Sequence, residues 1–329
     1  MKIFSLPLFI LLFLKPSLRA NEKENPEYRT YSQTCMGTKF SLLIDGHNIQ
    51  LANHAAQSAF KEAHRLDKIL SDYNSDSELS ILSQSSGSPD SFPASDDLFY
   101  LLARSQELAH ETEGAFDITI GPLSRLWRIA RFKKVLPTNE KRINAQERMG
   151  YQNLVLDYDR KTVELLMSGM VLDLGGIAKG YATDRMHTIL LEHNVTRFLI
   201  DAGGDILLGD PPRGKGGWKI SIGGRKHPGL PNLVLANVAI ATSGDLEQSV
   251  TLMGNTYSHL INPVTGIGLT TLAQVTIIAP NATQADSLAS ACLVLGSKKG
   301  IPFLEKKTGV QGFFLEQKGN KTVLKKTEK

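Results

Sequence analysis

Residues 173–180 read DLGGIAKG and join an apolar run to a stretch with helical spacing. The apolar run, residues 167–174, predicts a strand, and residues 177–191 predict a helix, so the glycine pair falls at a strand–helix junction. Glycines there let a ligand approach the backbone, and the helix N-terminus offers N–H groups to a phosphate. The pattern is neither a Walker loop nor the dinucleotide fingerprint, so neither of those nucleotide folds is predicted.

Further elements are predicted on both sides of this junction. Their order follows no regular β-α-β rhythm, which favours an α+β fold with mixed sheets and packed helices over a doubly wound parallel sheet. No convincing linker interrupts residues 35–317, so we expect a single compact unit. Strands are predicted at residues 40–44, 198–201, 218–222, 233–241 and 273–279, and helices at residues 51–70, 96–109, 177–191 and 286–295.

The N-terminus has the layout of a secretory signal peptide, residues 1–20, with a positive start and a short apolar run. Export to the periplasm follows, and an uncleaved anchor that associates the chain with the inner membrane is the alternative. Residues 21–34 form a polar lead-in that we expect to be loosely ordered. Residues 35–329 form the functional domain, and the lysine-rich end, residues 318–329, is expected to be a solvated tail.

Charge and cysteine content exclude several classes of protein. Without residues 1–20 the chain has 34 basic and 33 acidic residues, a balance that indicates no nucleic-acid surface. The two cysteines, Cys35 and Cys292, lie in apolar surroundings and are expected to be buried and unlinked. No cysteine–histidine cluster has zinc spacing.

Three side chains could act on a ligand, and each has an ordinary alternative. Lys179 could pair with a phosphate or face solvent. Phe116, in the run GAFDITIGP of residues 114–122, could stack on a ring or belong to the core. His259, just before an Asn-Pro turn, could be a general base or a surface residue.

Two acidic segments could bind a metal ion. Asp286 and Ser290 are four residues apart on a predicted helix, so they share a face, and their oxygens suit magnesium better than zinc. Residues 201–205, DAGGD, could bind a metal or form a tight turn, and the turn is favoured. Taken locally, the favoured interpretation is an acid at the start of a helix, Asp286, followed by an incidental serine, Ser290.

The order of these segments along the chain and their amino-acid sequences resemble those of the ApbE family of FAD:protein FMN transferases. The resemblance covers most of the chain after the signal and implies an ApbE-like, T-fold-related domain that binds FAD in a cleft. It rests on residues 36–38, 73–79, 114–122, 173–181, 201–206, 242–245, 259–266 and 285–296.

The resemblance also implies roles for individual residues. Magnesium would be held by the side chains of Asp286 and Ser290 and by the carbonyl of Gly176. The family usually has threonine at the position of Ser290, and Asp-Pro where this chain has Asn262-Pro263, which puts any carboxylate role there in doubt. The implied contacts to FAD are Met36, Tyr73, Ala115, Phe116, Asp117, Asp173, Lys179 and Leu260.

The implied reaction is a magnesium-dependent transfer of FMN from FAD to a threonine hydroxyl of another protein, with His259 as base and AMP as leaving group. The resemblance implies an acceptor with a Ser/Asp-Gly-x-Thr motif, such as a subunit of a respiratory NADH:quinone reductase-type complex. The alternative is an FAD pyrophosphatase that yields FMN and AMP. The third hypothesis is a non-catalytic exported flavin-binding protein.

Overall fold

The computed structural model describes residues 28–46, 48–222, 230, 232–244, 250–252, 254–258, 260–270, 273–318 and 321–328. The predicted signal and the first part of the lead-in lie outside these residues. From Tyr28 onward the lead-in is a strand, so the expectation of loose order is wrong there. This strand, β1 (Tyr28–Cys35), pairs along its whole length with β2 (Thr38–Asp45). Its polar side chains fit an edge strand, which is hydrogen-bonded on one side only.

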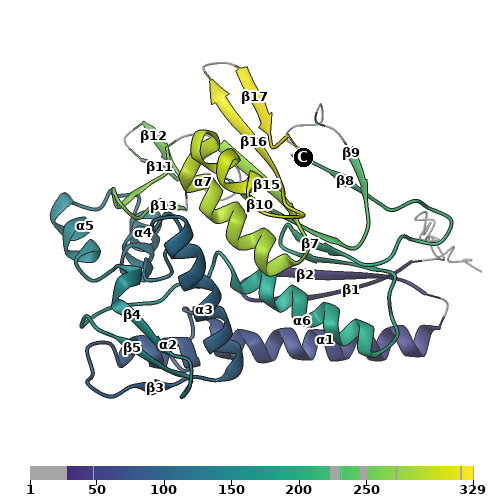
Figure 1. Ribbon diagram of the computed structural model, residues 1–329, viewed down its shortest axis with the longest axis horizontal. Coiled ribbons are helices and arrows are strands. Elements are labelled where there is room, and N and C mark those ends of the chain that lie inside the picture. The colour runs from purple at the N-terminus through teal and green to yellow at the C-terminus, as the bar shows by residue number, and fades with distance from the viewer. Residues whose placement is uncertain are drawn as a thin grey trace, which may run out of the picture.

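An antiparallel sheet of eight strands organises the molecule (Figure 1). The predicted α+β class is confirmed, because each pair of strands in this sheet is antiparallel. Within the predicted solvated end, residues 321–326 form the edge strand β17 (Lys321–Lys326), whose side chains are mostly exposed. In sheet order the strands are β1, β2, β6 (Phe198–Ala202), β7 (Asp205–Leu208), β10 (Val238–Gly244), β15 (Ala273–Ala279), β16 (Gln311–Lys318) and β17 (Lys321–Lys326).

Three long helices cover one face of the sheet: α1 (Ile49–Leu70), α6 (Ala178–Glu192) and α7 (Ala282–Glu305) (Figure 1). Asn48 and Asn281 cap α1 and α7 by accepting hydrogen bonds from backbone N–H groups of the first turn. Alternation along the strands separates the two faces of the sheet. Phe40 and Leu42 join the main core beneath the helices, whereas Leu43 packs on the opposite face.

The opposite face is covered by a two-stranded ribbon, β8 (Trp218–Ser221) and β9 (Asn232–Leu235). The predicted single strand over residues 233–241 is in fact the end of β9 and the start of β10. Asn237 separates them because it has φ 54°, a left-handed conformation that ends an extended run.

A smaller layer packs beside α1. It contains α2 (Glu78–Gln84), α3 (Asp96–Glu111), a short 3-10 helix (Tyr151–Asn153) and the sheet of β3 (Phe92–Pro93), β5 (Thr162–Leu165) and β4 (Leu154–Asp157).

The predicted strand over residues 167–174 is absent, and only Val171 forms a bridge, to Ile120. Met170, Leu172 and Leu174 are buried in the main core. The alternating pattern therefore reflects the burial of these side chains and not the pairing of a strand.

A third unit has its own small core around Trp127, whose indole N–H donates to the carbonyl of Gly266 at 2.9 Å. This third unit consists of α4 (Gly121–Lys133), α5 (Asn139–Gln146), β11 (Val250–Leu252), β12 (Asn255–Tyr257), β13 (Ile261–Asn262) and β14 (Ile267–Gly268).

Both cysteines, Cys35 and Cys292, are buried and free, as predicted. Within the described ranges, no helix has the length and apolar character that a membrane span requires.

Candidate active site

A cavity of about 1310 Å³ lies where the main sheet, the helices α6 and α7 and the third unit meet. The structure brings eleven of the predicted site residues to its wall, although they come from distant parts of the chain. His259 lies outside the described residues, and its neighbour Leu260 is on the wall. The eleven are Met36, Tyr73, Ala115, Phe116, Asp117, Asp173, Gly176, Lys179, Leu260, Asp286 and Ser290.

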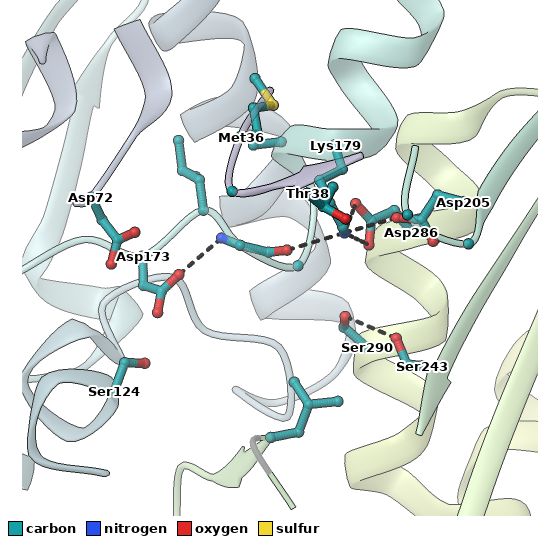
Figure 2. Close-up of a pocket in the computed structure, with 18 of the residues that line it drawn as sticks. Met36, Thr38, Asp72, Ser124, Asp173, Lys179, Asp205, Ser243, Asp286 and Ser290 are labelled. Atoms are coloured by element: carbon teal, nitrogen blue, oxygen red, sulfur yellow. Dashed lines mark hydrogen bonds and ion pairs between the residues drawn. The ribbon is translucent and has the colours of Figure 1, made fainter. Parts of the chain in front are cut away.

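Lys179, in the first turn of α6, lies between two carboxylates (Figure 2). Its Nζ is 2.7 Å from Oδ2 of Asp205 and 3.3 Å from Oδ2 of Asp286. The backbone N–H of Gly180 donates a 3.0 Å hydrogen bond to the same Asp286 oxygen. A side chain at position 180 would place its Cβ 2.3 Å from the carbonyl oxygen of Ala282, so glycine is what allows α6 and α7 to approach this closely.

Burial and mutual charge set the protonation of this cluster. Burial lowers the pKa of Lys179, but the charges of Asp205 and Asp286 outweigh it and hold that pKa above its usual value. Burial, together with the charge of Asp286, raises the pKa of Asp205 to about 7, although Lys179 opposes the shift. Lys179 therefore stays positively charged at neutral pH and is held inside the cavity rather than facing solvent.

Sequence reasoning did not select Asp205 as a site residue. It interpreted the DAGGD segment as a turn, and this is correct for Asp201, whose Oδ1 accepts a hydrogen bond from the N–H of Gly204 at 2.8 Å. Asp205 is the first residue of β7 and lines the cavity with a buried side chain. A buried acid next to a site lysine became recognisable only when the sheet brought β7 beside α6.

Gly176 and Ser290 lie against each other. A Cβ at position 176 would be 2.9 Å from Oγ of Ser290 and 3.3 Å from Cε2 of Phe116. The hydroxyl of Ser290 is also 3.4 Å from the hydroxyl of Ser243 on β10 (Figure 2). The segment of residues 173–180, a turn that leads into α6, thus reaches the face of α7 that carries Asp286 and Ser290.

The donors in this corner of the cavity fit magnesium. They are hard oxygens, and magnesium is typically held by one or two carboxylates together with substrate phosphates. Within the part of the chain that the structure describes, no group of three or more histidine, cysteine, aspartate or glutamate residues could hold a metal ion. The predicted set includes a single carboxylate, that of Asp286, so a ligand's phosphate oxygens would be needed to complete the coordination.

A second charged cluster at the cavity was not predicted. Nη2 of Arg128, on α4, is 2.5 Å from Oδ2 of Asp72 and 3.2 Å from Oδ2 of Asp173. The guanidinium lies 4.0 Å from the centre of the Tyr73 ring, whose residue is 79% exposed and so leaves ring surface free for a planar ligand. Burial and the charge of Asp173 raise the pKa of Asp72, and Arg128 opposes that rise.

Asp173 also shapes the glycine pair, because its Oδ1 accepts a hydrogen bond from the N–H of Gly175 at 2.9 Å. No local signal in the sequence identifies Arg128, which belongs to a helix 45 residues before Asp173. The resemblance pointed to Asp173 as a contact for FAD. The structure adds that this carboxylate is paired with arginine and fixes the backbone turn that leads into α6.

The loop of residues 114–120 is held by Asp117. Its Oδ1 accepts hydrogen bonds from the N–H and the hydroxyl of Thr119, at 2.8 and 2.7 Å, and its Oδ2 accepts one from the N–H of Tyr151 at 3.1 Å. Burial nevertheless raises the pKa of Asp117. Phe116 is both a core residue and part of the cavity wall, so the two interpretations of this side chain do not exclude each other.

Two further segments of the resemblance, at residues 36–38 and 260–266, form turns beside the cavity. Met36 has φ 49° in the turn between β1 and β2, and its N–H donates to Asp67 at 3.1 Å. Asn262 accepts hydrogen bonds from the N–H groups of Val264 and Thr265, at 2.9 and 3.2 Å. An aspartate would accept the same bonds, so the Asn-Pro departure preserves the turn after Leu260.

Comparison with known proteins identifies the same resemblance independently. Residues 36–314 match the sequence profile described as the ApbE family. A protein of Treponema pallidum named FAD:protein FMN transferase is 32% identical over 282 residues, covering 80% of this chain and 77% of the relative. One of the same name from Haemophilus influenzae is 30% identical over 304 residues, covering 88% and 87%.

Solved structures share the fold. The ApbE protein from Thermotoga maritima superposes with a TM-score of 0.82 at 27% identity, covering 92% of this chain and 97% of the other. The flavin transferase ApbE from Vibrio cholerae superposes with a TM-score of 0.80 at 25% identity, with the same coverage. The single compact unit predicted for this chain therefore has solved counterparts over nearly its whole length.

Proposed function

The chain belongs to the ApbE family, and from this premise we propose that it transfers FMN from FAD to a threonine hydroxyl of an acceptor protein. The observation that carries the proposal is the corner of the cavity where Lys179, Asp286, Gly176 and Ser290 meet. The relatives named FAD:protein FMN transferase, which align with most of this chain, support the same activity.

In this proposal the pyrophosphate of FAD lies at the start of α6. The helix begins at Ala178, and the positive end of its dipole lies at this edge of the cavity. Lys179 adds a full positive charge at the same place. Both features favour a doubly charged pyrophosphate, and both belong to the segment that the resemblance assigns to FAD.

Asp286, Ser290 and the backbone of Gly176 would hold magnesium in this corner. A bound magnesium ion would stabilise the negative charge that develops on phosphate oxygens as the pyrophosphate breaks. Gly180 supports the arrangement by orienting the Asp286 carboxylate through its N–H. The metal is inferred from the chemistry of the donors and from the family resemblance.

The chemical step is a substitution at the phosphorus on the riboflavin side. The threonine oxygen of the acceptor forms a bond to that phosphorus, and the bond to the bridging oxygen breaks. AMP leaves with the bridging oxygen, and FMN remains as a phosphoester on the acceptor. His259 would accept the hydroxyl proton, because an unassisted threonine hydroxyl is a poor nucleophile.

The proposed acceptor carries a Ser/Asp-Gly-x-Thr motif and is of the kind found in respiratory NADH:quinone reductase-type complexes. The predicted signal at residues 1–20 would direct this chain to the periplasm. Transfer requires a shared compartment, so the proposal requires the acceptor motif to be exposed there as well.

The test combines the chain without residues 1–20, FAD and a folded acceptor domain with the motif, in the presence and absence of magnesium. We expect AMP release and an acceptor heavier by one FMN only when magnesium is present. AMP release with no change in acceptor mass would indicate hydrolysis of FAD instead. Binding of FAD without AMP release would replace the transferase by a flavin-binding protein.

A further inference from the structure

The helix α4 presents two different faces beside the cavity. Ser124, Arg128 and Arg131, spaced by four and three residues, line the cavity wall. Ile129 and Phe132 lie on an adjacent face and are 54% and 88% exposed, and Val135, just beyond the helix, is 64% exposed. One helix thus combines a wall of the cavity with apolar side chains that project into solvent.

The turn between β13 and β14 repeats this arrangement. Pro263 lines the cavity, and the next residue, Val264, is 79% exposed. The side-chain amide of Gln146, on α5, donates to the carbonyl of Val264 at 2.8 Å and ties the turn to the third unit. We call the four side chains of Ile129, Phe132, Val135 and Val264 the rim.

The segment that carries most of the rim is strongly basic. Residues 121–150 contain eight arginine and lysine residues and two glutamates, whereas the whole chain has a net charge of +4. Lys133 and Lys134 directly follow Phe132 and are exposed. A surface with exposed apolar side chains among positive charges is complementary to an acidic partner with an apolar centre.

We propose that the rim is the surface on which the acceptor protein docks, and that the acceptor presents an acidic patch there. The inference rests on the proposed function, in which a hydroxyl of another protein must enter the cavity. The rim side chains are exposed and do not line the cavity, so they are available to a body larger than FAD. The proposed reaction requires a protein acceptor and does not require a membrane, which favours a protein as the occupant of the rim.

Three variants, called the rim variants, test the rim and the two lysines beside it. Phe132→Ser removes the most exposed apolar side chain, and Lys133→Glu reverses a neighbouring charge. Lys134→Gly removes a charge at a residue whose φ of 55° is left-handed, a conformation that glycine adopts without strain. A loss of binding in this last variant therefore cannot be attributed to strain introduced into the backbone.

The probe is a purified soluble acceptor domain that carries the Ser/Asp-Gly-x-Thr motif beside an acidic surface. Its binding to the enzyme is measured directly by calorimetry, at low and high salt. We expect each variant to raise the dissociation constant, roughly tenfold for Phe132→Ser, because truncation of an apolar anchor commonly costs that much. Salt should weaken the binding to the unmodified enzyme more than the binding to Lys133→Glu.

Controls carry comparable changes on other surfaces: Val234→Ser, which also replaces an exposed apolar side chain by serine, on β9, and Lys298→Glu on α7, both outside the cavity wall. They should bind the acceptor domain as the unmodified enzyme does. FAD binding, followed by flavin fluorescence, should be unchanged in all of these variants. Rim variants that bind the acceptor domain normally would overturn the proposal.

The design separates the two proposals. Rim-dependent binding without FMN transfer would support docking and contradict the transferase function. Normal transfer and normal acceptor binding by the rim variants would support the function and overturn docking. Vesicles of phosphatidylcholine and phosphatidylglycerol provide the last comparison, since rim-dependent binding to them with no effect on the acceptor domain would assign the rim to a membrane and overturn the proposal.

Discussion

The backbone N–H of Gly180 donates a 3.0 Å hydrogen bond to Oδ2 of Asp286, although the two residues are 106 positions apart. The bond joins the first turn of α6 to the first turns of α7 and orients the carboxylate toward the cavity. It exists because glycine leaves room for the backbone at Ala282. The hydrogen bond restricts the orientation of the carboxylate before it binds a cation.

Replacing Asp286 by alanine should therefore remove magnesium-dependent turnover. We expect AMP release to fall by at least about 10–100-fold, the loss typical of even the outer-shell partners of a metal. The measurement is the initial rate of AMP release against magnesium concentration. Asp159→Ala, an exposed acid on a turn, is the control and should behave normally. Near-normal, magnesium-dependent turnover in Asp286→Ala would rule out its assignment as a ligand.

Replacing Gly176 by alanine should disturb the same corner by steric means alone. The added Cβ would be 2.9 Å from Oγ of Ser290, so Ser290 or Phe116 must move. We expect the free energy of unfolding to fall by about 1–3 kcal/mol, as in other overpacked sites, and the apparent magnesium affinity to weaken. Gly216→Ala is the matched control, because no atom lies within 4 Å of its added Cβ. Equal stability and magnesium affinity for both variants would contradict this account.

Replacing His259 by alanine should slow FMN transfer without weakening FAD binding. General base catalysis typically contributes about 10²–10⁴-fold, and we expect a loss in kcat of that size. Stopped-flow AMP release at saturating FAD measures the chemical step, and flavin fluorescence measures binding. If the variant instead loses FAD affinity and regains the full rate at saturating FAD, His259 binds the substrate and is not the base.

The ion pair between Asp45 and Arg213 should make stability depend on pH. Burial acts to raise the pKa of Asp45, but hydrogen bonds from the backbone N–H, Nε and Nη2 of Arg213, at 2.6, 3.1 and 2.7 Å, outweigh it and hold that pKa below its usual value. A lowered pKa in the folded state stabilises the protein above the unfolded value of about 4. This stabilisation is lost as the pH falls through the folded value.

Asp45→Asn should accordingly lower the free energy of unfolding by about 2 kcal/mol at pH 7, and the difference from the unmodified protein should shrink below about pH 4. Urea unfolding over a range of pH measures both effects. Glu107→Gln, which breaks an exposed pair with Arg104, should cost less than about 1 kcal/mol. A difference for Asp45→Asn that does not change with pH would contradict the linkage.

Local patterns in the sequence were sufficient for the elements whose interactions are local. The helical spacing of residues 51–70 predicted α1, which begins directly after its N-cap residue, Asn48. The apolar run of residues 273–279 predicted β15. The prediction was wrong at residues 167–174, where buried side chains alternate without forming a strand. It was also wrong at residues 233–241, where the left-handed residue Asn237 separates two strands. Hydrophobic spacing records which side chains are buried and does not record what pairs with the backbone.

The sequence by itself determined the α+β class, the order of the site segments and the identity of Lys179, Asp286 and Ser290 as candidates. Only the tertiary structure decided that Lys179 lies between Asp205 and Asp286, and that Arg128 joins Asp72 to Asp173. The reason is physical: the energy of an ion pair depends on distance and burial. Both are set by the packing of helices and strands that are far apart in the chain.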